Sequence, residues 1–143
     1  MSAIANVVQV LGGRRVLGRG VTSADELRER TRVGLPYAAL RTVMDRYGLT
    51  TEEISKALHL PRRTLARRVR GRFRADESDR LLRLARIAAE ATQVLGSAAK
   101  AGDWLHQPNR ALGQQPPLQL LDTDLGTRQV EEVLGRIEHG VFS

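Results

Sequence analysis

The stretch TTEEISKALHLPRRTLARRVRGRFR, residues 50–74, decides the predicted fold. Thr50 and Glu53 have the spacing of a capping box, in which each side chain accepts a hydrogen bond from the other residue's backbone N–H. The short helix that they open is followed by a tight turn and by Pro61, a residue favoured at the start of a helix. Two short helices joined in this way predict a helix-turn-helix. His59 stands where glycine is usual in such a turn, and histidine tolerates a positive φ better than most residues.

The apolar residues of this stretch mark its inner face, and its arginines mark the outer face. Ile54, Leu58, Leu60, Leu65 and Val69 are expected to pack inward. The second helix, expected over residues 61–70, then presents its cations outward, as a recognition helix does in the major groove of DNA. The DNA-binding candidates are Arg62, Arg63 and Arg67 for bases or phosphates, Thr64 beside them, and Arg68 and Arg70, with Arg72 and Arg74, mainly for phosphates.

The net charge of the chain is concentrated in this stretch. The 143 residues carry 23 Lys and Arg against 16 Asp and Glu, which gives a formal charge of +7. Residues 61–74 alone hold seven arginines and no acid, whereas residues 118–143 carry two cations and five acids. Solvated helix faces usually mix both signs, and the planar fork of arginine suits phosphate and guanine. The excess therefore favours nucleic-acid contact over a merely solvated face.

Composition excludes several classes of protein. A hydrophobic fraction of 41% is typical of a globular chain, and the absence of cysteine excludes disulfides and thiolate metal sites. No apolar run approaches the ~18 residues that a membrane span requires. The three histidines have no metal-ligand spacing, and phosphate-loop and nucleophile-elbow motifs are absent. We expect a cytoplasmic protein with no catalytic residues, no metal, no cofactor and no membrane partner.

The rest of the sequence predicts an all-α protein. Helices are expected from Ser23 to Gly34, from Pro36 to Gly48, from Asp76 to Gly96 and then on to His106, followed by a turn-rich connection and a last helix from Thr127 to His139. Four glycines within residues 1–22 favour a loosely held arm or a short helix with loops. The expected division is an N-terminal arm and short helix (1–34), a helix-turn-helix region with a long connecting helix (35–95), and a small helical domain with a C-terminal tail (96–143).

Several strings in residues 35–143 resemble, in order and spacing, the Xre/MbcA/ParS-type antitoxin family. They are LPRRTLARR (60–68), DESDRLLRLA (76–85), WL (104–105), PNRAL (108–112), PL with LLDT (117–123), Gly126, and VEEVLGRIEHG (130–140). The ending GRIEHG is the most specific of them. The resemblance implies an Xre-like helix-turn-helix followed by a toxin-binding domain.

The resemblance also implies partners. Family members bind a RES-domain toxin, an enzyme with an ADP-ribosyltransferase-like fold that consumes NAD+, and place their C-terminal end at its active-site entrance. They are usually homodimers that bind operator double-stranded DNA and repress their own operon. By position, the blocking end here is Arg136, Glu138, His139, Gly140, Val141, Phe142 and Ser143, and Trp104 helps to shape the toxin-facing domain. The acidic residues of 118–143 are expected to face a cationic NAD+-phosphate pocket.

Two alternatives stay open at this point. The chain could be a stand-alone helix-turn-helix regulator whose C-terminal region only dimerises, with the long helix from Asp76 contributing to the dimer. The helix-turn-helix could also be degenerate and serve only packing. For Trp104 and Phe142, the alternative to toxin contact is packing in the hydrophobic core.

Overall fold

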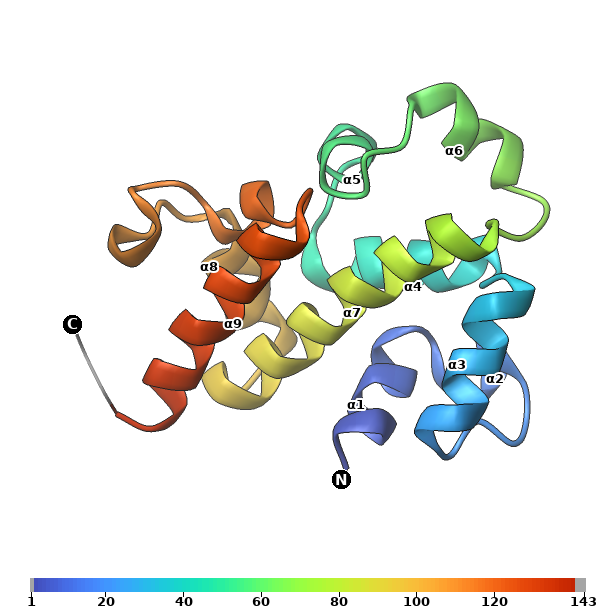
Figure 1. The fold of residues 1–143 in the computed structure, drawn as a ribbon, viewed down its shortest axis with the longest axis horizontal. Coiled ribbons are helices and arrows are strands. Elements are labelled where there is room, and N and C mark those ends of the chain that lie inside the picture. Colours follow the sequence, from blue (N-terminus) through green and yellow to red (C-terminus); the bar gives the residue numbers. More distant parts are fainter. Residues whose placement is uncertain (1, 141–143) are drawn as a thin grey trace.

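The structure is a computed structural model that describes residues 2–140, and over these residues it is helical without a sheet (Figure 1). The α-helices are α1 (Ala3–Val10), α2 (Gly13–Leu17), α3 (Ala24–Val33), α4 (Tyr37–Tyr47), α5 (Thr51–Ala57), α6 (Arg62–Arg68), α7 (Ala75–Leu95), α8 (Ala98–His106) and α9 (Asp124–Glu138). Two 3₁₀ turns, η1 (Arg110–Leu112) and η2 (Pro117–Leu120), lie between α8 and α9. The predicted all-α class is confirmed.

Local signals set the helix ends. The Oγ of Ser23 accepts the backbone N–H of Glu26 at 3.2 Å at the start of α3, and Gly48 ends α4 with φ 68°. The capping box of α5 forms as predicted, with the Thr50 N–H on the Glu53 carboxylate at 2.9 Å and the Glu53 N–H on the Thr50 hydroxyl at 3.1 Å. The last helix begins three residues earlier than predicted, at Asp124, because the Thr123 hydroxyl caps it.

The long helix α7 is the central element of the fold. It runs diagonally through the middle of Figure 1, with α1 and α3 on one side and α8 and α9 on the other. Leu81, Leu84 and Ile87 are fully buried along it. The apolar face of α7 is therefore largely covered within the chain, and both halves of the protein share one hydrophobic core.

The first 34 residues do not form a loosely held arm. Val7, Val10, Leu11 and Leu17 are buried in the common core, with α1 and α3 against α7. The glycines end short helices here and allow tight turns between them: Gly12 and Gly18 have φ of 108° and 83°. Of the two readings of this segment, short helices with loops is the one that the structure supports. None of the helices in the described residues has the length and hydropathy that crossing a membrane requires.

Candidate nucleic-acid and protein interfaces

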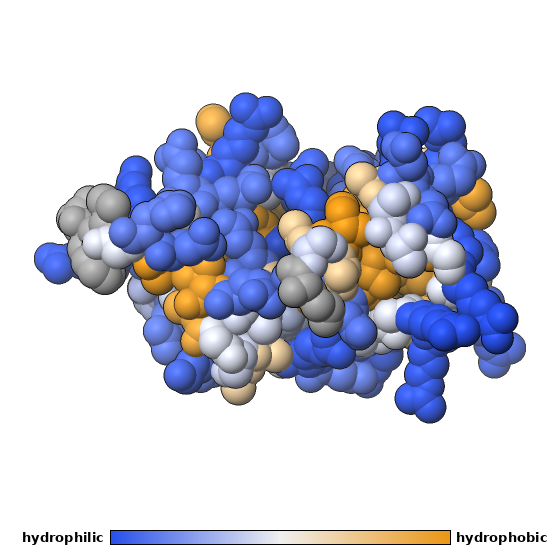
Figure 2. Space-filling view, turned by 90° about the horizontal axis from the view of Figure 1, so that it is seen from below, coloured by the Kyte–Doolittle hydropathy of each residue, from blue (hydrophilic) through white to orange (hydrophobic). Residues whose placement is uncertain are grey.

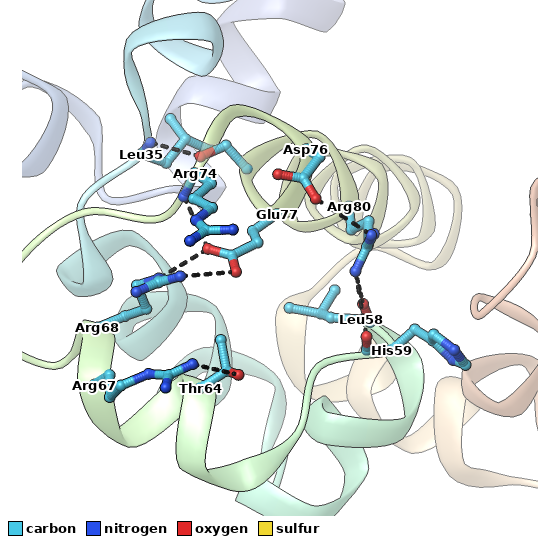
Figure 3. A network of polar contacts seen from close by, with 11 residues as sticks. Leu35, Leu58, His59, Thr64, Arg67, Arg68, Arg74, Asp76, Glu77 and Arg80 are labelled. Carbon is cyan, nitrogen blue, oxygen red and sulfur yellow. Dashed lines mark hydrogen bonds and ion pairs between the residues drawn. The ribbon is translucent and has the colours of Figure 1, made fainter.

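Helices α5 and α6 and the turn between them form the predicted helix-turn-helix. His59 adopts a φ of 54°, which is the left-handed conformation expected at this turn. The guanidinium of Arg80, on α7, donates to the carbonyl oxygens of Leu58 and His59 at 3.3 and 3.2 Å (Figure 3). A neighbouring helix therefore fixes the turn, and no sequence motif signals this contact.

Four of the predicted DNA-binding arginines lie on the exposed side of α6 or just beyond its end. They are Arg62, Arg63, Arg67 and Arg70. Thr64 is buried instead, and its hydroxyl accepts a hydrogen bond from Arg67 at 3.3 Å. The exposed cationic face of α6 is thus the one that the sequence predicted. Thr64 does not belong to this face, but its hydrogen bond helps to orient Arg67 on it. In Figure 1 α6 protrudes at the upper edge of the molecule, where a groove of DNA can reach it.

Arg68 does not share this exposed face. Its guanidinium makes two hydrogen bonds to the Glu77 carboxylate, at 2.9 and 3.1 Å, and its side chain is only 17% exposed (Figure 3). Position 68 follows buried Thr64 by one helical turn and so faces the N-terminus of α7. The expectation that Arg68 contacts phosphate is therefore replaced by a structural role inside the protein.

Glu77 is the acceptor on which this corner of the fold converges. Its carboxylate also accepts the backbone N–H of Arg74 at 2.8 Å, which caps α7. The hydrogen bonds from Arg68 hold the pKa of Glu77 below its ordinary value despite burial, and the Arg74 N–H adds to this. Glu77 remains ionised at neutral pH and compensates one of the seven arginine charges in residues 61–74.

The end of α6 differs from the prediction. The helix stops at Arg68, and Val69 is 51% exposed although its spacing from Leu65 predicted an inward position. Val69 keeps helical dihedral angles, with φ −50° and ψ −36°, so its exposure shows that neighbouring elements leave this position uncovered. Arg72, just beyond, donates to the carbonyl of Gly34 at 3.0 Å and so ties this end to the loop before α4.

An ion pair joins the helix-turn-helix to the C-terminal half. His106 Nε2, on α8, lies 2.9 Å from the Glu53 carboxylate on α5, and His106 Nδ1 lies 2.7 Å from the carbonyl of Gly102. Burial opposes protonation of His106, but these two hydrogen bonds outweigh it, and the pKa of His106 is raised. Burial likewise opposes ionisation of Glu53, yet the Thr50 N–H and His106 lower its pKa overall.

Three of the predicted protein-binding residues, Trp104, Arg136 and Glu138, lie on α8 and α9, which both pack against α7 and η2. Trp104 is half-buried against the core, so it serves packing at least in part. Arg136 and Glu138 are exposed on the last turn of α9, and His139 and Gly140 follow it. The predicted positions Val141, Phe142 and Ser143 lie outside the described residues. Within residues 2–140, acidic and histidine side chains form no group with the arrangement of a metal site.

Comparisons with known proteins agree with this arrangement. Residues 26–86 match the antitoxin Xre-like helix-turn-helix domain, and residues 90–140 match the antitoxin Xre/MbcA/ParS C-terminal toxin-binding domain. A protein of Photorhabdus laumondii named antitoxin Xre is 32% identical over 90% of this chain and 89% of its own length.

Two further relatives with the same name are similar. The Pseudomonas putida protein is 39% identical over 82% of this chain and 75% of its own length. The Yersinia enterocolitica protein is 40% identical over 64% of each chain, so this match spans slightly less than two thirds of that relative. With both of its domains matched in order and with relatives aligned over most of its length, the chain belongs to the Xre/MbcA/ParS antitoxin family.

Proposed function

We propose that this chain is the non-catalytic antitoxin of a type II toxin–antitoxin pair in the cytoplasm, and that its toxin is a RES-domain enzyme that consumes NAD+. The observation that carries the proposal is the match of residues 90–140 to a toxin-binding domain, a match that ends just after α9. In this proposal residues 136–143 cover the entrance of the toxin's active site. Arg136, Glu138, His139 and Gly140 make polar contacts, Val141, Phe142 and Ser143 enter the site, and Trp104 supports the docking domain from α8.

The helix-turn-helix supports a second activity of the same protein, which is autorepression as a homodimer on operator DNA. Arg62, Arg63, Arg67 and Arg70 are exposed together on or beside α6, the helix that such folds insert into the major groove. Arg62 and Arg63 lie at the N-terminal end of α6, and Arg67 lies one turn further along the same exposed side. These three are the candidates for base edges. Arg70 is a candidate for phosphate. Arg68 and Thr64 position α6 and Arg67 and do not touch the DNA.

Co-expression with the neighbouring gene tests the antitoxin activity. The RES-domain protein encoded beside this chain is expected to stop growth and lower cellular NAD+ when produced alone, and the full chain should restore both. A chain lacking residues 140–143 is expected to fail in this rescue, while a chain with Arg62, Arg63 and Arg67 changed to Ala should rescue fully. If the chain restores growth and NAD+ equally with and without residues 140–143, the tail does not block the toxin. If the two proteins form no complex, the result would support a stand-alone regulator instead.

A further inference from the structure

A groove between α1, α3, α7 and α9 combines an apolar floor with an acidic rim. It has a volume of about 600 Å³, and Ile4, Leu27 and Leu82 contribute apolar side chains to it. Glu90 from α7 and Glu131 and Glu138 from α9 also line it. We call this feature the acidic groove. Figure 2, which views the molecule from below Figure 1, shows apolar surface exposed between hydrophilic side chains on the face where α1 lies.

The charge of the acidic groove opposes that of the whole chain. Its lining carries four acids, the three above and Asp79, against two arginines, Arg28 and Arg86, in a chain whose net charge is +7. Both arginines already have partners: Arg28 lies 3.4 Å from Asp25, and Arg86 lies 3.5 Å from Glu131. The groove therefore retains acidic charge that its own cations do not neutralise.

Glu90 is the half-buried acid of the groove that has no cation partner among residues 2–140. It has no hydrogen bond to these residues either. Burial raises the pKa of Glu90, and the charges of Glu131 and Glu138 raise it further against the opposing effect of Arg86. A half-buried carboxylate that lacks a cation costs stability in the free protein. A cation supplied by a partner would remove this cost on binding.

We propose that the acidic groove binds an apolar segment of the toxin that carries an arginine or lysine, with the cation beside Glu90 and the apolar side chains on Ile4 and Leu82. This inference rests on the proposed function and names a second contact for the same partner. Glu90, Glu131 and Glu138 all fall within the residues that match the toxin-binding domain. The groove also reaches the last turn of α9, so a toxin covered by residues 136–143 would lie next to it.

A second copy of this chain fits the groove less well. Closed dimers place the same patch of both copies face to face. Glu90, Glu131 and Glu138 of one copy would then meet the same acids of the other, and this like-charge contact is unfavourable. The chemistry of the groove therefore favours a basic partner over a self-complementary one.

An exposed acid on α3 provides a control. Glu29 lies 3.7 Å from Arg32, does not line the acidic groove and is outside the residues that match the toxin-binding domain. The affinity of the full chain for the RES-domain protein encoded beside it is measured by calorimetry for wild type, Glu90→Gln/Glu131→Gln and Glu29→Gln. We expect the groove variant to bind at least about tenfold more weakly and Glu29→Gln to bind within about twofold of wild type. Circular dichroism confirms folding, and Glu90→Gln alone, which removes an uncompensated charge, replaces the double variant if that variant unfolds.

Each other result has a defined meaning. Wild-type affinity in the groove variant overturns the acidic-groove proposal and leaves the proposed function intact. Failure of the wild-type chain to bind the RES-domain protein overturns the proposed function itself. A groove variant that keeps its affinity for the RES-domain protein but loses its dimer mass in light scattering assigns the groove to a second copy and also overturns the proposal.

Discussion

The Glu77 carboxylate accepts two hydrogen bonds from the Arg68 guanidinium, at 2.9 and 3.1 Å, and thereby ties α6 to the first turn of α7. The same carboxylate caps α7 through the Arg74 N–H, so one side chain fixes both the start of the central helix and the orientation of the DNA-binding helix. Because Arg68 is held inside the protein, the DNA-facing charge of α6 depends on the exposed arginines around it.

We expect Glu77→Gln to lower both stability and DNA affinity. Glutamine keeps the size of the side chain but removes the charge that holds Arg68 and weakens the cap of α7. The expected cost to the free energy of unfolding is about 1–3 kcal/mol, measured by urea denaturation at neutral pH. Since α6 is then less well oriented, affinity for the DNA upstream of this chain's gene should also fall. Unchanged stability would show that the contact between Arg68 and Glu77 is not important for the fold.

Arg67→Ala is expected to lower DNA affinity while leaving stability nearly unchanged. Arg67 is exposed and its one side-chain hydrogen bond in the described residues is to Thr64, so its removal should change stability by less than about 0.5 kcal/mol. DNA affinity should fall by about 1–3 kcal/mol if Arg67 reads a base edge, and by a similar factor on all sequences if it binds phosphate. Titrations at several salt concentrations distinguish the two, because each lost phosphate contact lowers the salt slope by roughly one unit. A flat salt response in the wild-type protein would contradict phosphate contact altogether.

The pair of Glu53 and His106 predicts how stability depends on pH. The pKa of His106 is raised above 6.5, so its contribution is complete below about pH 6.5 and is lost as the pH rises through the folded-state pKa. The pKa of Glu53 is lowered below 4.5, so its contribution is present above about pH 4.5 and is lost as the pH falls further. The pair therefore stabilises the contact between α5 and α8 most between about pH 4.5 and 6.5.

His106→Gln should accordingly lower the melting temperature more at about pH 5.5 than at about pH 8.5. His139→Gln is the control, because His139 is exposed and lies 3.8 Å from Glu138 at the end of α9. The difference between wild type and His106→Gln would be the same at both pH values if the pair did not contribute. Asp103, which also favours the protonated form of His106, stays unchanged in all variants.

The features that the sequence predicted correctly depend on residues that are close together along the chain. The capping box at Thr50, the stop at Gly48 and the left-handed turn at His59 each depend on residues within one helical turn, and all three are present in the structure. The class of fold and the exposed arginine face follow from the same short-range periodicity.

The features that the sequence could not give depend on contacts between distant residues. Arg68 and Arg63 are both arginines on one seven-residue helix, and only the approach of Glu77 distinguishes their roles. The acidic groove brings Glu90 together with Glu131, more than forty positions later, and with Ile4 near the start of the chain. Periodicity assigns a residue to a face of its own helix, but it does not indicate which other helix covers that face.

Two helical glycines give a last, paired prediction about the contact between the two domains. A Cβ at Gly102 on α8 would lie 2.8 Å from the carbonyl oxygen of Tyr47 on α4, whereas a Cβ at Gly135 on α9 would have no atom within 4 Å among those compared. Alanine favours a helix over glycine by about 1 kcal/mol, so Gly135→Ala should stabilise the protein by up to that amount. Gly102→Ala gains the same propensity but forces α8 away from α4, with a net loss of about 1–3 kcal/mol. Urea denaturation measures the free energy of unfolding of both variants. Equal effects would show that α8 and α4 can separate slightly without loss of stability.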